Sequence, residues 1–280
     1  SLMRVEVSEY NSFCSDKFLG NPAGVCMDEG FSKEEKQKIA YKNGFSETAF
    51  LLEEDSHFRI SFFTPTSEID LCGHATVASA VHLSSQIGIK NVTFRANHDF
   101  LYCDINNENV SLILPDQNIV KKEPNSEIKE ILGPSCIDFY ESEIHFIGIL
   151  DSFDNLMKWN NDFYSQEKLA KDQLILTSRS GNSDYDYALR MFGTKNLGVR
   201  EDPVTGSAQP PIFSYWSKIL KKEDVLVYQS SERGGLMRVK RDLRGIDVNG
   251  RVYKQYLTKT IKYRYKLLGI RGTKLGRFVA

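Results

Sequence analysis

The stretch Leu71-Cys72-Gly73-His74-Ala75-Thr76-Val77-Ala78-Ser79-Ala80 changes at a glycine from a turn into a run of small and apolar residues. A second such stretch, Glu201-Asp202-Pro203-Val204-Thr205-Gly206-Ser207-Ala208, follows about 130 residues later. Each predicts a strand or loop that ends in glycine and turns into a helix. Because the first amides of a helix lack intrahelical partners and carry its positive dipole end, each opening predicts a carboxylate or phosphate site. Together they predict two similar halves that face each other across one cleft.

Titratable residues lie beside both openings. His74 is at the mouth of the first predicted helix, Asp202 precedes the second, and Glu47 lies in the segment Phe45-Ser46-Glu47-Thr48-Ala49-Phe50-Leu51. Taken alone, Glu47 also fits a surface carboxylate at a strand edge, His74 a helix N-cap, and Asp202 a turn residue before Pro203. The residues alone favour these structural interpretations for Glu47 and Asp202 and leave His74 open.

Length and composition indicate a protein with a large core. The chain has 280 residues, of which 41% are hydrophobic, so we expect one large domain or two of ordinary size. With 36 basic against 37 acidic residues, no overall electrostatic field favours nucleic acid or an anionic membrane as a partner.

No apolar run approaches the roughly 20 residues that span a bilayer. No signal peptide is indicated, because a strand-like segment begins at Met3. Five scattered cysteines, without a C-x-x-C or zinc spacing, indicate reduced thiols and a cytoplasmic location.

Strands are expected to outnumber helices. We expect helices near residues 33–43, 73–86, 153–159, 164–171 and 206–220, with short strands between them; the first begins at a capping box of Ser32 and Glu35. The polar, proline-bracketed segment 115–124 predicts a boundary. The fold class is therefore α+β with two pseudo-symmetric domains, residues 1–116 and 117–280, each a curved mixed sheet wrapped around a central helix.

Several segments in a fixed order carry a family resemblance. They are Phe18 to Val25, Ser46 to Leu51, Phe63-Thr64-Pro65 with Glu68 to Ala80, Arg200 to Ala208 and, more weakly, Gln229 with Arg233-Gly234. In these segments the chain resembles the PhzF (phenazine biosynthesis-like) family, which is related in fold to diaminopimelate epimerase. The resemblance covers about residues 3–240.

The resemblance implies a cofactor-independent isomerase with its active site between the two halves and no metal. It implies that Glu47 is the acid/base, that His74, Asp202 and Ser207 are further catalytic residues, and that Gly73, Thr205 and Gly206 bind the substrate. A buried carboxylate with a raised pKa can take a proton from carbon and return it, and helix N-termini can stabilise the carbanion. The expected substrate is a small carboxylate-bearing metabolite, and the expected assembly is a homodimer.

Two other functions remain open. One is a single-base racemase or epimerase of an amino or hydroxy acid, and the other is a binding protein that kept the cleft without turnover. A racemase with two thiols is disfavoured, because Thr205 stands where a second cysteine would be needed. We interpret Cys72 as a packed small residue.

The chain departs from the family pattern in two places. Gln209-Pro210-Pro211 follows Ser207-Ala208, and proline is tolerated in a first helical turn, so we expect the helix to persist. Residues 238–280 carry 13 Lys/Arg against 2 Asp/Glu, and we interpret the chain after about Arg241 as an atypical basic tail. Such a tail suits a nucleic-acid arm, a solvated surface element with a dimer contact, or a divergent end with no selected role. The first is the least favoured, so nucleic acid is not an expected partner.

Overall fold

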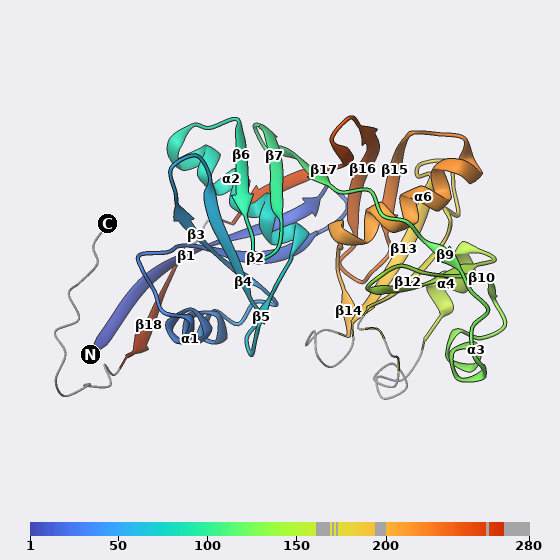
Figure 1. Cartoon of the computed structure of the whole chain (residues 1–280), viewed down its shortest axis with the longest axis horizontal. Helices are drawn as coiled ribbons and strands as arrows, with labels where there is room; N and C mark the ends of the chain where they lie inside the picture. Colours follow the sequence, from blue (N-terminus) through green and yellow to red (C-terminus); the bar gives the residue numbers. More distant parts are fainter. Residues whose placement is uncertain (161–168, 170, 172, 194–199, 256–257, 266–280) are drawn as a thin grey trace.

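The structure, a computed structural model, describes residues 1–160, 169, 171, 173–193, 200–255 and 258–265. Its strands join into one continuous, strongly curved sheet with two lobes, and Figure 1 shows strand β17 running between them. The helix expected near 164–171 falls mostly outside the described residues. The α+β class with two similar halves is confirmed.

The first lobe is a closed ring of strands. Strand β1 pairs with β2, and the pairing continues through β3, β4, β6, β7, β8 and β17 back to β1. The β2–β3 and β4–β6 pairs are parallel and the others are antiparallel. The strands are β1 (Leu2–Cys14), β2 (Asn21–Met27), β3 (Thr48–Glu53), β4 (Phe58–Phe63), β6 (Asn91–Arg95), β7 (Phe100–Asn106), β8 (Asn109–Leu114) and β17 (Gly245–Lys254).

The second lobe repeats this order of pairings. From β10 the sheet continues through β11, β12, β13, β15, β16 and β17, with β11–β12 and β13–β15 parallel. The parallel pairs therefore occupy the same places as in the first lobe, which is the internal pseudo-symmetry expected from the sequence. The strands are β10 (Cys136–Glu141), β11 (His145–Leu150), β12 (Gln173–Arg179), β13 (Tyr187–Gly193), β15 (Asp224–Gln229) and β16 (Gly235–Asp242).

One apolar helix packs inside each curved sheet. Helix α2 (Gly73–Ile87) is buried on all sides over residues 73–80, and its small side chains let the strands approach closely. Helix α6 (Gln209–Leu220) follows a short 3-10 turn, η2 (Gly206–Ala208). Pro210 and Pro211 lie in its first turn, as expected. Trp216 anchors α6 by stacking on Tyr187 and by donating from Nε1 to Oγ1 of Thr177 at 2.9 Å.

Smaller elements complete the lobes. Helix α1 (Lys33–Asn43) has the predicted capping box between Ser32 and Glu35. The segment 115–124 contains a two-residue strand, β9, that pairs with β10, and the sequence analysis missed helix α3. None of the helices in the described ranges has the length and apolarity to cross a bilayer. The remaining elements are β5 (Glu68–Ile69), β9 (Val120–Lys121), α3 (Ser126–Leu132), α4 (Phe153–Lys158) and β14 (Glu201–Asp202).

The interpretation of the chain after Arg241 as a tail was wrong for the described residues. Strand β17 pairs with β16, β8 and β1, so it closes the first ring and joins the lobes. Strand β18 (Lys259–Arg264) adds to the edge of β1 (Figure 1). Its basic residues point outward while Ile261 and Tyr263 are buried, so the basic composition hid a period-2 strand.

Candidate active site

The two central helices begin against each other. A Cβ added to Gly73 would lie 3.3 Å from the backbone nitrogen of Ser207 and 3.4 Å from Cα of Gly206. The N-cap residues Cys72 and Thr205 make no side-chain capping bond to their helices. Two positive helix ends with uncapped first amides therefore converge at one place in the fold.

A cavity of about 60 Å³ opens at this junction. Every predicted site residue lines it, and so do further residues of both lobes. The lining residues are Glu47, Ile69, Leu71, Cys72, Gly73, His74, Gln173, Met191, Asp202, Thr205, Gly206 and Ser207. The structure thus brings together residues that are up to 160 positions apart in the sequence.

Glu47 and His74 are in direct contact at the cavity. Nε2 of His74 lies 3.0 Å from Oε2 of Glu47, and the Ser46 hydroxyl donates to the same oxygen at 2.6 Å. Both side chains are buried, at 4% and 9% exposure. Burial alone would raise the pKa of Glu47, but His74 and Ser46 outweigh it and leave that pKa below the ordinary value. Glu47 is therefore held as a carboxylate with one oxygen engaged.

Asp202 faces this pair from the second lobe. Its Oδ1 accepts from Nδ2 of Asn21 at 2.8 Å, and its Oδ2 accepts from the hydroxyl of Thr205. Burial, with a smaller contribution from Glu47, raises the pKa of Asp202 to about 6, although His74, Thr205 and Asn21 oppose the change. The surroundings thus lower the pKa of Glu47 and raise the pKa of Asp202, the two carboxyl groups at the cavity.

Gln229 fixes the turn that carries Asp202 and Thr205. Its Oε1 accepts from the Thr205 amide at 2.7 Å. Its Nε2 donates to the carbonyl of Asp202 and to Oγ1 of Thr205, both at 3.0 Å. Gln229, which belongs to the weaker part of the family match, therefore holds in place the turn that precedes the second helix start.

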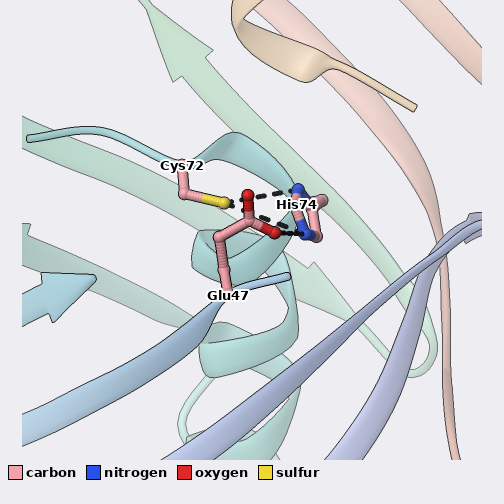
Figure 2. A group of neighbouring side chains, drawn as sticks. All are labelled: Glu47, Cys72 and His74. Carbon is pink, nitrogen blue, oxygen red and sulfur yellow. Dashed lines mark hydrogen bonds and ion pairs between the residues drawn. The ribbon is translucent and has the colours of Figure 1, made fainter. Parts of the chain in front are cut away.

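Cys72 lies over the ring of His74. Its Sγ is 3.3 Å from Nδ1 and 3.9 Å from Nε2. An atom in the ring plane and in line with one ring nitrogen would lie far from the other ring nitrogen. The sulfur is close to both nitrogens, so it lies over the face of the ring (Figure 2). Burial raises the pKa of Cys72, which keeps it a neutral thiol at neutral pH.

Glu47, Cys72 and His74 offer oxygen, sulfur and nitrogen within 4.8 Å of one another, a combination that can hold a metal ion. The ring geometry does not suit this use, however. A metal binds in line with a ring nitrogen, and the sulfur lies over the face of the same ring. Figure 2 shows the three side chains converging on one another.

Asn21 is a site residue that the sequence analysis did not select. It is fully buried, and its Nδ2 lies close to Asp202, His74 and the carbonyl of Val204. It stands within the Phe18 to Val25 match, but Gly20-Asn21-Pro22 was interpreted only as a turn. Its place inside a segment that matches the family was the sequence signal that could have found it.

The fold and site can now be compared with known proteins. The model of the PhzC-PhzF family, described as phenazine biosynthesis-like protein, matches residues 10–254. An uncharacterized isomerase of Halalkalibacterium halodurans is 32% identical, over 85% of this chain and 92% of its own. A second uncharacterized isomerase, from Pseudomonas aeruginosa, is also 32% identical, over 87% of this chain and 93% of its own. A mouse phenazine biosynthesis-like domain-containing protein is 31% identical, over 83% and 90%.

Solved structures give the same result. A putative phenazine biosynthesis PhzC/PhzF protein from Clostridium difficile superimposes with a TM-score of 0.82 at 29% identity, covering 94% of this chain and 100% of that one. A probable proline racemase from Agrobacterium radiobacter, covering 94% and 93%, superimposes at 0.63 with 10% identity and shares the fold alone. The protein is thus an isomerase with an epimerase-like fold. The chain belongs to the PhzC-PhzF, phenazine biosynthesis-like, family.

Proposed function

We propose that the protein moves a proton between carbon atoms of a small carboxylate-bearing metabolite, with Glu47 as the acid/base and no cofactor. The observation that carries the proposal is the position of Glu47, a buried carboxylate beside two converging helix ends. Its two described hydrogen bonds both end on Oε2. The other oxygen, Oε1, is then the one that takes the proton from carbon.

The proposed reaction has two proton transfers. Oε1 of Glu47 takes a proton from a carbon conjugated with the substrate carboxylate, and the electron pair of the broken C–H bond moves into an enolate. The resulting carboxylic acid, whose acidic proton exchanges with solvent between the two transfers, then protonates another carbon of the conjugated system. The helix amides at Gly73 and Gly206 stabilise the charge that develops on the substrate, and Ser207 adds a hydroxyl donor. Atoms and charge balance without a redox partner.

Exchange with solvent tests this proposal. The protein is incubated in heavy water with a pool of small carboxylic acids, including dihydro-aromatic acids, and masses and isomers are followed. We expect a label or rearrangement that Glu47→Gln abolishes while ligand affinity, measured by thermal shift, is kept. Glu54→Gln is the matched control, because Glu54 is also a glutamate paired to a histidine, His57 at 2.6 Å, but lies outside the cavity. Chemistry that persists in Glu47→Gln would overturn the assignment of the base.

A second candidate is an epimerase that inverts one carbon. It is favoured by the two carboxyl groups that line one cavity, Glu47 from the first lobe and Asp202, with a pKa of about 6, from the second, since groups on opposite faces of a substrate can remove and return its proton. Label at the original carbon with inverted configuration would select it, whereas label at a different carbon supports proton migration. Ligand binding by the wild-type protein without any label in the substrate would favour a binding protein.

A further inference from the structure

Asn21 is held rigidly where the two lobes meet. Before it, Gly20 turns with a φ of +72° and donates its amide to the carbonyl of Gly234 at 2.9 Å. The guanidinium of Arg233 in turn donates to the carbonyl of Gly20 at 2.7 Å, and Phe18 stacks on Tyr228 with ring centroids 4.7 Å apart. The first-lobe segment that leads into Asn21 is thus fastened to the second lobe.

The surroundings of Asn21 fix the orientation of its amide. Nδ2 lies 2.8 Å from Oδ1 of Asp202 and 2.9 Å from the carbonyl oxygen of Val204. The Val204 carbonyl accepts hydrogen bonds in every protonation state, so the nitrogen must face it. The reversed amide would place two acceptors against each other. The two hydrogens of Nδ2 go to these two oxygens, so the amide nitrogen that faces His74 offers it no hydrogen-bond acceptor.

This orientation determines where His74 carries its proton. Nδ2 of Asn21 lies 3.2 Å from Nδ1 of His74. A proton on Nδ1 would point at an amino group that is itself a donor. The Cys72 sulfur gives no alternative acceptor, because it lies over the ring face instead of in line with Nδ1. The proton of a neutral ring therefore belongs on Nε2, which faces Glu47.

We propose that Asn21 is a positioning residue that keeps Nδ1 of His74 unprotonated, so that neutral His74 donates from Nε2 to Glu47. A neutral imidazole orients the carboxylate without the full pairing energy of an imidazolium, and Glu47 stays basic enough to take a proton from carbon. The charged or titratable groups that face His74 are Glu47, Cys72 and Asp202. Only the consequence for catalysis rests on the proposed function; the protonation state does not.

Burial lowers the pKa of His74, and the neighbouring Cys72 and Glu47 raise it well above the usual value for histidine. The contribution of Cys72 requires a thiolate, whereas burial raises the pKa of that thiol. Glu47 then favours a proton on Nε2 of His74, whereas the Asn21 amide disfavours a proton on Nδ1. Replacing Asn21 by aspartate would remove the opposition at Nδ1, because a carboxyl oxygen accepts a hydrogen bond from Nδ1. The same change places an acceptor against Asp202 and the Val204 carbonyl, so thermal unfolding of this variant is compared with that of the wild type.

Nitrogen NMR of the full chain labelled with ¹⁵N-histidine tests the proposal at pH 7. His74 is identified among the five histidines by the signals that His74→Asn removes. We expect the shifts of a ring protonated at Nε2 and unprotonated at Nδ1. An Nδ1-protonated tautomer or an imidazolium in the wild-type spectrum would overturn the proposal, and this result needs no variant at Asn21.

The variant Asn21→Asp provides the second readout. We expect both nitrogens of His74 to become protonated and solvent exchange into substrate to fall about 10- to 100-fold. Asn249→Asp is the control, because it makes the same charge change at an asparagine whose amide donates to Ser111 outside the cavity. If Asn21→Asp leaves the ring unchanged, the proposal is wrong. Activity that survives Glu47→Gln would instead defeat the proposed function alone.

Discussion

His74 donates from Nε2 toward Oε2 of Glu47 across 3.0 Å, although His74 opens helix α2 and Glu47 precedes strand β3. The contact lies in the interior of the protein, where solvent screens electrostatic interactions poorly. It opposes the effect of burial on Glu47 and so keeps a carboxylate in an otherwise dry position. The contact thereby connects the protonation of the proposed base to one neighbouring side chain.

Replacing His74 should therefore raise the pH at which Glu47 becomes ionised. In His74→Asn, burial is no longer opposed by the imidazole, and the pKa of Glu47 rises. We expect the acidic limb of the exchange rate to move to higher pH by about one unit or more. The measurement is the pH dependence of deuterium incorporation. A lower rate with an unmoved acidic limb would show that His74 acts only on the substrate.

The raised pKa of Asp202 predicts a pH-dependent stability. Between the unfolded pKa of about 4 and the folded pKa of about 6, the native state binds more protons than the unfolded state, so this group makes stability fall as pH rises. Asp202→Asn should remove this dependence and stabilise the protein by about 1–2 kcal/mol above pH 6. Thermal unfolding from pH 4 to pH 8 measures it. Identical pH profiles for the two proteins would contradict the prediction.

The approach of the two helix ends predicts a steric effect at Gly73. In Gly73→Ala, the new Cβ would lie 3.3 Å from the Ser207 nitrogen, and the openings must separate slightly. We expect a loss of about 1–3 kcal/mol in stability and of about 100-fold in exchange rate. Gln86→Ala, at an exposed position of the same helix, is the control for substitution itself. Full activity in Gly73→Ala would show that the helix ends need not touch.

Strand β18 is attached to the protein through Tyr263. Its hydroxyl donates to Oε2 of Glu35 at 2.7 Å, and the ring is buried between β18 and α1. Tyr263→Phe should cost about 1.5–3 kcal/mol, because a hydrogen bond to a charged group is lost while the packing is kept. Chemical unfolding compares it with Tyr265→Phe on the same segment. Equal midpoints for the two variants would mean that the bond contributes nothing.

The small-residue helices, the family and the residues grouped at the cavity were predictable from the sequence. Glycine openings and apolar helices are local signals, and Glu47, His74 and Asp202 lie in motifs whose order is specific. Asn21 was missed because its importance comes from contacts with Asp202 and Val204, which are about 180 positions away in the sequence. No local pattern reports such a contact.

The last strands were missed for a different physical reason. Near the end of β17 and along β18, buried residues such as Val252 and Ile261 alternate with less buried residues that include arginine and lysine. Net charge describes the outer face of such strands and says nothing of the inner face. A strand that completes a ring can be identified only from the two strands that it pairs with. For β17 these are β8 and β1, which are both far away in the sequence.

The position of β17 has a consequence for how the protein is made. The first ring of strands stays open between β8 and β1 until residues 245–254 have left the ribosome. A nascent chain that ends at residue 116 exposes two unpaired strand edges, which favour misfolding and aggregation. Synthesis through residue 254 therefore precedes closure of the ring that holds Glu47 and His74. The proposed base lies in a ring that closes only after most of the second lobe has been made.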